Sequence, residues 1–326
     1  MTAKQGSTKK IKVIYCMGAG RSGSTVLNTI LGSHPDITGG GELQNAGRVF
    51  TNDEYCSCGE RVSACPFWVP VYQKWSDRIG EGKIQETFQR KYKIEHFKSP
   101  FAWMKLATAY KGQADFLKDY LNHTYEFFKA ISEVSGKAVV ADVSKNPLRA
   151  WALMHHPLID LRIIHLVRDG RAVAWSLKKA YKIDVKAGLE KELKPRPIWR
   201  TALFWSVVNR QANFVRKRAQ NVCVIRYEDL TRFPAETLQK IGAMAEVDFN
   251  PVIDIMDRQD PLPVSHILAG NKLRMAKTIK LKFNKEWTEK MDTKDQETFF
   301  KFTRRTMQRF GYGPAGALSP LQESKI

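Results

Sequence analysis

The sequence lacks any long apolar run. Its first apolar run, residues 11–17, ends at Gly18, and no later segment approaches the length of an uncharged apolar run that could cross a bilayer. A helix that spans a bilayer needs about 20 apolar residues, and the first run is also too short for the core of a secretion signal. We therefore expect no transmembrane segment, and we expect a soluble, cytoplasmic protein.

Acidic residues are scarce relative to basic ones. The chain has 33 Asp and Glu residues against 53 Lys and Arg residues, so its formal net charge is +20. Such a charge favours acidic partners: a multiply phosphorylated nucleotide, an anionic polysaccharide, a membrane surface or a nucleic acid. Charge alone does not choose among these partners.

Cysteine is infrequent, with five residues, yet three of them lie close together as Cys56, Cys58 and Cys65. A structural zinc site would need a fourth ligand, and the sequence offers no second Cys-x-x-Cys motif and no adjacent His pair. The alternatives are a disulfide from Cys65 to Cys56 or Cys58, and reduced structural thiols, which we favour, so we expect no metal. Cys16 and Cys223 lie in apolar strand patterns and are expected in the core.

The chain alternates short β-branched runs with helical patterns. The expected strands are residues 12–17, 138–141, 161–167 and 222–226. This alternation predicts an α/β fold with a P-loop-like central parallel sheet that is covered by helices on both faces. We expect a single domain over residues 1–326, with a helical insert over 51–137 and a loose tail over 313–326.

A glycine-rich turn follows the first expected strand. Residues 18–25 read Gly-Ala-Gly-Arg-Ser-Gly-Ser-Thr. Gly18, Gly20 and Gly23 allow the backbone to approach an anion closely, and the N–H groups that open the next helix supply unpaired donors and the positive end of a dipole. The turn therefore predicts a site for an anionic ligand.

Three known patterns overlap on this turn. The dinucleotide pattern needs a second strand that ends in an acid about 20 residues later, but the acid here, Glu42, follows three glycines instead of an apolar run. The Walker A pattern needs a lysine where this chain has Ser24. The third pattern is the 5'-phosphosulfate loop of sulfotransferases, a basic residue before Ser-Gly-(Ser/Thr)-Thr, which residues 21–25 match.

Further motifs extend this resemblance over nearly the whole chain. The branch that includes the protein-tyrosine sulfotransferases and many bacterial enzymes continues from the loop to His-Pro-Asp and then Gly-Glu, as residues 34–36 and 41–42 do here. Residues 163–176 resemble the family's 3'-phosphate site, and residues 225–230 and 266–274 resemble two later motifs in the same order. The sequence is therefore similar to the sulfotransferase superfamily.

The resemblance implies transfer of a sulfuryl group from 3'-phosphoadenosine 5'-phosphosulfate (PAPS) to an acceptor hydroxyl, with no metal. Arg21 and Lys145 are then expected beside the transferring group. Glu42 is expected to remove the acceptor proton, with His34 as the alternative base. The other residues of the expected PAPS site are Gly20, Ser22, Gly23, Ser24, Thr25, Arg168, Ser176, Tyr227, Gly270, Asn271 and Arg274.

Within this site, the resemblance assigns roles to five side chains. Arg168 and Ser176 are expected to bind the 3'-phosphate, since one lies at a strand end and the other two turns into the next helix. Tyr227 is expected near the adenine. Asn271 and Arg274 are expected on a basic flap that closes on the 3'-phosphate.

Two other functions stay open at this point. Residues 139–142 could be the Walker B strand of a divergent P-loop kinase or nucleotide hydrolase, which should need magnesium. The charge could also serve a non-catalytic polyanion binder, although we expect no specific nucleic-acid partner. The acceptor can be an acidic glycan, a lipid or a small molecule in a pocket that the insert shapes, and neither its identity nor the oligomeric state follows from the sequence.

Overall fold

A five-stranded parallel sheet forms the centre of the protein, with strand order β2-β3-β1-β4-β5. The computed structural model describes residues 10–84, 115–179, 183–186, 192 and 194–321. The strands are β1 Ile11–Met17, β2 Ile37–Gly41, β3 Val139–Lys145, β4 Ile159–Val167 and β5 Val222–Arg226. A separate antiparallel pair is formed by β6 Leu262–Pro263 and β7 Thr278–Ile279.

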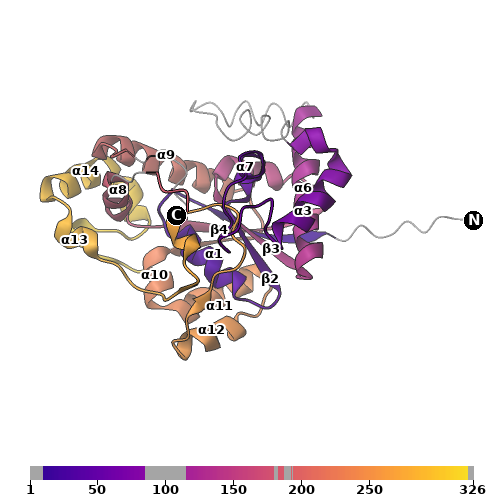
Figure 1. Ribbon diagram of the computed structural model, residues 1–326. Helices are drawn as coiled ribbons and strands as arrows, with labels where there is room; N and C mark the ends of the chain where they lie inside the picture. The colour runs from indigo at the N-terminus through magenta and orange to yellow at the C-terminus, as the bar shows by residue number, and fades with distance from the viewer. Residues whose placement is uncertain (1–9, 85–114, 180–182, 187–191, 193, 322–326) are drawn as a thin grey trace, which may run out of the picture.

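Helices cover both faces of this sheet, which confirms the predicted α/β fold (Figure 1). The helices are α1 Ser24–Gly32, α2 Ala46–Thr51, α3 Trp68–Ile79, α6 Asp115–Ser135, α7 Pro147–Leu153, α8 Gly170–Lys178, α9 Ile198–Arg216, α10 Tyr227–Arg232, α11 Pro234–Ala245, α12 Asn250–Asp257, α13 Glu286–Lys290 and α14 Thr293–Arg309. Short 3-10 turns are η1 Leu43–Asn45, η2 Lys272–Met275 and η3 Pro314–Gly316. In the described ranges, no helix is both long enough and apolar enough to cross a bilayer.

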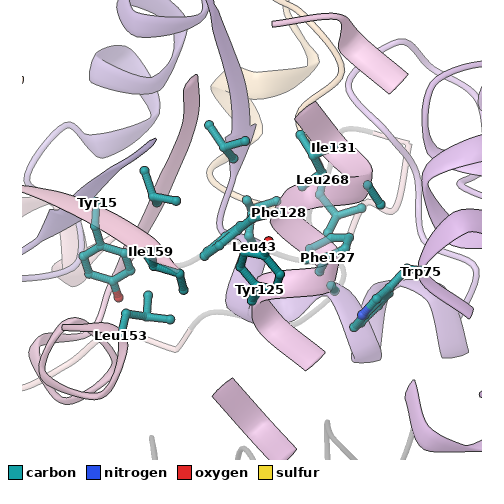
Figure 2. Close-up of a cluster of buried hydrophobic side chains, with 14 of the residues drawn as sticks. Tyr15, Leu43, Trp75, Tyr125, Phe127, Phe128, Ile131, Leu153, Ile159 and Leu268 are labelled. Carbon is teal, nitrogen blue, oxygen red and sulfur yellow. The ribbon is translucent and has the colours of Figure 1, made fainter. Parts of the chain in front are cut away.

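The central strand β1 divides its side chains between two cores. Val13, Tyr15 and Met17 belong to a buried cluster with residues of α3, α6 and α7, part of which Figure 2 shows around Tyr15. Ile14 and Cys16 belong to a second cluster with residues of α1, α11 and α12. Because a strand alternates its side chains and β1 is buried on both faces, a continuous apolar run is required. This packing fixes the point at which the glycine turn leaves the sheet.

Strand β2 is absent from the sequence prediction because glycines are depleted in strands. Its glycines are required by close packing against α1 and the segment that precedes η2. An added Cβ would lie 2.8 Å from the Asn28 carbonyl oxygen at Gly39, and 2.7 Å from the Ala269 carbonyl oxygen at Gly41. The Asn28 side chain also accepts a hydrogen bond from the Gly41 N–H (2.9 Å). The strand therefore passes tightly against its neighbours and places Glu42 at its carboxyl end.

The described part of the expected insert is largely helical. Helices α3 and α6 lie side by side at one edge of the molecule (Figure 1) and contact each other through Trp75 and Phe127, whose ring centroids are 4.4 Å apart. Residues 85–114 of the expected insert lie outside the described residues.

The described part of the expected tail makes several hydrogen bonds. The Gly313 N–H donates to the Ala317 carbonyl (2.7 Å). Arg226, at the end of β5, donates to the Ser319 carbonyl (2.6 Å). These hydrogen bonds connect part of the expected tail to itself and to the end of β5. Residues 322–326 lie outside the described part of the chain.

A buried histidine in β4 makes the fold sensitive to acid. His165 is fully buried, and its Nε2 donates to the Asn209 side-chain oxygen on α9 (3.0 Å). Burial lowers the pKa of this imidazole from 6.5 to about 4. The unfolded chain therefore binds more protons than the folded chain between these two pH values.

We expect the free energy of unfolding to fall as the pH drops from 6.5 to 4, by up to about 3 kcal/mol from this group. The variant His165→Gln keeps a donor for Asn209 without a titrating ring, so its stability should depend less on pH in this window. The control His155→Gln changes an exposed ring and should behave like the wild type. Urea unfolding at several pH values measures all three, and equal pH dependence in wild type and His165→Gln would contradict the assignment.

Candidate active site

The turn between β1 and α1 presents backbone donors at the carboxyl edge of the sheet. Gly23, the residue before α1, has a φ of +94° and provides no side-chain cap for the helix. The N–H groups of the first helical turn therefore have no intrahelical acceptor, and they suit an anion. An added Cβ at Gly23 would lie 2.2 Å from the Tyr227 ring, so only glycine allows this close approach. The Gly18 N–H donates to the Lys145 carbonyl (2.9 Å) and ties the turn to β3.

A cavity of about 270 Å³ opens beside this turn. Every strand of the sheet contributes at least one lining residue at or after its carboxyl end: in the order β1 to β5, these include Arg21, Glu42, Lys145, Arg168 and Tyr227. Open α/β sheets bind ligands at this edge. The other expected residues that line the cavity are Gly20, Gly23, Ser24, Thr25, Ser176, Gly270 and Asn271. Val26 and Leu273, which no motif identifies as site residues, complete the lining.

Two arginines and a serine meet on the cavity wall. Arg168 donates from Nη1 to the Arg21 carbonyl (3.0 Å), and its guanidinium lies 4.5 Å from the centroid of the Tyr227 ring. The buried Nε of Arg168 has no hydrogen-bond partner within the described ranges. Arg21 donates from Nε to the Ser176 hydroxyl (2.9 Å). Guanidinium groups placed in this way suit the planar, forked recognition of phosphate.

The tyrosine of this group is a neutral partner for the arginine. Burial raises the pKa of the Tyr227 phenol, although the Arg168 charge opposes the shift. The ring therefore presents an uncharged face to the Arg168 guanidinium at neutral pH. A cation over an aromatic face gains about 0.5–2 kcal/mol, and this stacking orients the guanidinium at the cavity.

Lys145 and Glu42 form an ion pair on the cavity wall. The Lys145 ammonium contacts one Glu42 carboxylate oxygen, and the two side chains are 17% and 20% exposed. The other carboxylate oxygen accepts a hydrogen bond from the Asn45 side chain (3.1 Å). The backbone N–H of Glu42 donates to the Ala269 carbonyl (3.0 Å). A carboxylate that is fixed at a cavity in this way can accept a proton from a bound hydroxyl group.

Arg21 and Lys145 share an uncommon backbone conformation. Their φ angles are +71° and +70°, in the left-handed region that non-glycine residues rarely adopt. Each such residue costs on the order of 1 kcal/mol or more, and this strain clusters at functional sites. Of the six described non-glycine residues with a positive φ, these two line the cavity, which supports a role for their side chains in ligand binding.

Three expected residues lie away from the cavity lining. Ser22 is almost fully buried. Arg274 is fully buried and donates to the Tyr55 carbonyl (2.9 Å), so its guanidinium holds the chain instead of facing the cavity. His34 is also buried, and its Nδ1 accepts the Asp36 N–H (3.0 Å). The His34 ring therefore orders the His-Pro-Asp turn.

The strand considered as a Walker B strand keeps its acid inside the protein. Asp142 is fully buried, outside the lining of the cavity. Its carboxylate accepts hydrogen bonds from Arg149 Nη2 (3.1 Å) and from the Ser144 N–H (3.0 Å). Because Arg149 already neutralises this carboxylate, Asp142 is poorly suited to hold a magnesium ion in this structure.

The structure corrects the expectation that the cysteine cluster lacks a fourth ligand. His266 lies beside Cys56, Cys58 and Cys65, and the four potential ligand atoms lie within 4.8 Å of one another. His266 is 201 residues from Cys65, so spacing motifs could not find it. The five cysteines are free thiols, and Cys16 and Cys223 are buried as expected.

Most of the sequence matches a known protein family. A model described as the sulfotransferase family matches residues 14–251. Among solved structures, the sulfotransferase domain of the Synechococcus PCC 7002 olefin synthase is 17% identical with a TM-score of 0.47, and the match covers 94% of this chain and 98% of that one. Sulfotransferase STF9 from Mycobacterium avium is 12% identical with a TM-score of 0.49, over 95% and 79%. None of the curated proteins matches. Because the family model spans more than half of the sequence, the chain belongs to the sulfotransferase family.

Proposed function

We propose that this sulfotransferase uses PAPS as its donor and a hydroxyl group as its acceptor. The observation that carries the proposal is the shared cavity of an uncapped α1 N-terminus, three cationic side chains and the Glu42 carboxylate. PAPS carries a phosphosulfate at its 5' position and a phosphate at its 3' position. It therefore needs two neighbouring anion sites, together with a base for the acceptor proton.

Each anionic group of PAPS has a counterpart in the cavity. The α1 N-terminus, with Arg21 and Lys145, suits the 5'-phosphosulfate. Arg168 and Ser176 suit the 3'-phosphate, and the unpartnered Nε of Arg168 leaves a donor for it. Tyr227, which lines the cavity under Arg168, is placed beside the adenine ring in this proposal. The donor site proposed here leaves out Arg274, whose guanidinium is bonded inside the protein.

The transfer step needs charge stabilisation and one proton acceptor. In an in-line displacement, the acceptor oxygen forms a bond to sulfur while the bond from sulfur to the 5'-phosphate oxygen breaks. Glu42 takes the acceptor's proton. The electron pair of the broken bond stays on the departing 3'-phosphoadenosine 5'-phosphate, and Arg21 and Lys145 stabilise this charge.

The Lys145–Glu42 ion pair suits both proton transfer and stabilisation of the leaving phosphate. The ammonium lies against the Glu42 carboxylate, the group that accepts the proton in this proposal. Once the carboxylate is protonated, its hold on the ammonium weakens. Lys145 can then interact more strongly with the leaving phosphate, so proton transfer and leaving-group stabilisation support each other.

In this proposal, the expected insert lies next to Glu42, on the side where the acceptor binds. Leu43 and Gln44, which directly follow Glu42, line a second, small cavity together with Trp75 of α3 and Phe127 of α6. This neighbourhood supports the proposal that the insert shapes the acceptor pocket. An acidic glycan, a lipid and a small alcohol all present a hydroxyl group, and the net charge favours an acidic acceptor.

Two assays separate this proposal from a P-loop kinase or nucleotide hydrolase. The first offers PAPS with a radiolabelled sulfuryl group and mixed hydroxyl acceptors without added magnesium, and we expect transfer. The second offers ATP with magnesium, and we expect no turnover. ATP turnover that disappears in Arg21→Ala would favour the kinase. Salt-dependent polyanion binding that is indifferent to Glu42, with no transfer, would favour a non-catalytic binder.

Arg168→Ala should weaken the binding of 3'-phosphoadenosine 5'-phosphate about 30- to 150-fold, because the loss of hydrogen bonds to a charged group costs about 2–3 kcal/mol. Isothermal titration measures the dissociation constant directly. The control Arg258→Ala removes the same charge from an exposed arginine that pairs with Asp260. If Arg168→Ala and Arg258→Ala bind the nucleotide equally well, Arg168 does not contact it.

Glu42→Gln should lower kcat by about 100-fold or more and leave nucleotide affinity nearly unchanged, because the amide keeps the shape of the side chain but loses its basicity. Steady-state assays with one acceptor measure the effect. His34→Gln is the comparison and should retain near-normal kcat. The opposite outcome, with normal turnover in Glu42→Gln and loss in His34→Gln, would transfer the role of the base to His34.

A further inference from the structure

Three thiols and one imidazole meet at a place where two distant chain segments cross. Cys56, Cys58 and Cys65 come from the segment before α3, and His266 comes from the segment before η2. The Cys58 and Cys65 sulfurs are 3.7 Å apart. His266 Nδ1 lies 3.3 Å from the Cys65 sulfur and 3.7 Å from the Cys56 sulfur.

These distances fit tetrahedral coordination of a zinc ion. Zinc–sulfur and zinc–nitrogen bonds of about 2.3 and 2.05 Å at tetrahedral angles separate two sulfurs by about 3.8 Å, and a sulfur from a nitrogen by about 3.5 Å. A disulfide requires sulfurs about 2.05 Å apart, and it would leave the third thiol and the imidazole without a common role. We propose that Cys56, Cys58, Cys65 and His266 form a structural zinc site.

The local backbone holds two of the ligands in place. Tyr55 and Arg61 pair as an isolated antiparallel bridge. Between them, the Cys56 N–H donates to the Glu60 carbonyl (2.8 Å), and the Gly59 N–H donates to the Cys56 carbonyl (3.0 Å). Gly59 closes this turn with a φ of +93°, a conformation that glycine adopts without strain. Cys56 and Cys58 therefore project from one tight turn.

The third cysteine and the histidine are oriented by separate contacts. The Cys65 carbonyl accepts the Val69 N–H (3.0 Å) at the start of α3, where the helix dipole favours a thiolate. The Phe67 ring stacks on the His266 ring, with centroids 5.4 Å apart and planes 18° from parallel. This stacking turns Nδ1 of His266 toward the sulfurs.

Ser57, between two of the cysteines, fastens the turn to the segment that carries the histidine. Its hydroxyl donates to the Ser265 carbonyl and accepts the Ile267 N–H (2.7 Å). Its own N–H donates to the Ile267 carbonyl (3.3 Å). The residues on both sides of His266 are therefore bonded to the residue between Cys56 and Cys58. The ligand set is preorganised before any ion arrives, which lowers the entropic cost of binding.

Four protein ligands leave no position for a water molecule or a substrate. Closed sites of this kind stabilise the fold, whereas catalytic zinc keeps an open position. Binding would displace the protons of the three thiols, so affinity should increase with pH. The proposed role is therefore separate from sulfuryl transfer and does not depend on it.

The zinc site would fix the segment that borders the cavity. Beyond His266, the Leu268 N–H donates to the Gly40 carbonyl (3.0 Å), and the Ala269 carbonyl accepts the Glu42 N–H (3.0 Å). Two residues further on, the Asn271 N–H approaches the Thr25 hydroxyl (3.4 Å). The metal would therefore join the start of the insert to the wall that carries Glu42 and Asn271.

Metal analysis of the full-length protein tests the site. After dialysis against a weak chelator, we expect elemental mass spectrometry to find about one zinc ion per chain. Cobalt(II) in place of zinc should give the thiolate charge-transfer bands and strong visible bands of a tetrahedral site. Zinc removal by a strong chelator should lower the midpoint of thermal unfolding, and zinc should restore it.

Cys58→Ser and His266→Ala should lose the metal in the same dialysis. Cys58 is exposed, so its substitution carries little risk for folding. The matched controls Cys223→Ala and His155→Ala change a buried thiol and an exposed imidazole outside the cluster, and they should keep the metal. Metal-free wild type, a cobalt protein without charge-transfer bands, or a disulfide between two of the three cysteines in unreduced peptides would overturn the proposal. A chain that binds zinc but transfers no sulfuryl group would overturn only the proposed function.

Discussion

The candidate site depends on one constraint: all strands of a parallel sheet end at the same edge. Residues that are far apart in the chain meet there because each follows a strand of the same sheet. Arg21 and Lys145 follow neighbouring strands β1 and β3, and Arg168 follows β4 on the other side of β1. The buried packing of β1 fixes the turn, and the start of α1 adds backbone donors. The cavity is therefore cationic because this topology brings the side chains of Arg21, Lys145 and Arg168 together.

Much of the fold could be predicted from local patterns. Four of the five strands are apolar runs that are buried on both faces, and such runs are visible in sequence. Strand β2 was missed because its three glycines contradict strand propensity. Two of them are explained by tertiary contacts: the Asn28 and Ala269 carbonyl oxygens would lie within 3 Å of a Cβ atom at Gly39 and at Gly41, respectively. Such contacts have no local signal in the sequence.

Motifs named the candidate site residues, but they could not give the directions of the side chains. Lys145 and Glu42 are 103 residues apart, and their contact depends on the ends of β3 and β2. Arg274 fits its motif, yet it turns into the protein to reach the Tyr55 carbonyl. His266 joins the cysteine cluster only because two segments cross, and the same crossing connects the proposed zinc site to the wall of the proposed donor site.

The central claim is that the cavity recognises a nucleotide through two separate anionic groups. Isothermal titration of the unmodified protein with 3'-phosphoadenosine 5'-phosphate and with adenosine 5'-phosphate tests it most directly, because the two ligands differ only in the 3'-phosphate. A phosphate held by Arg168 and Ser176 through charge-assisted hydrogen bonds predicts binding at least about 30-fold tighter for the first ligand. Equal affinity for the two nucleotides would contradict the account.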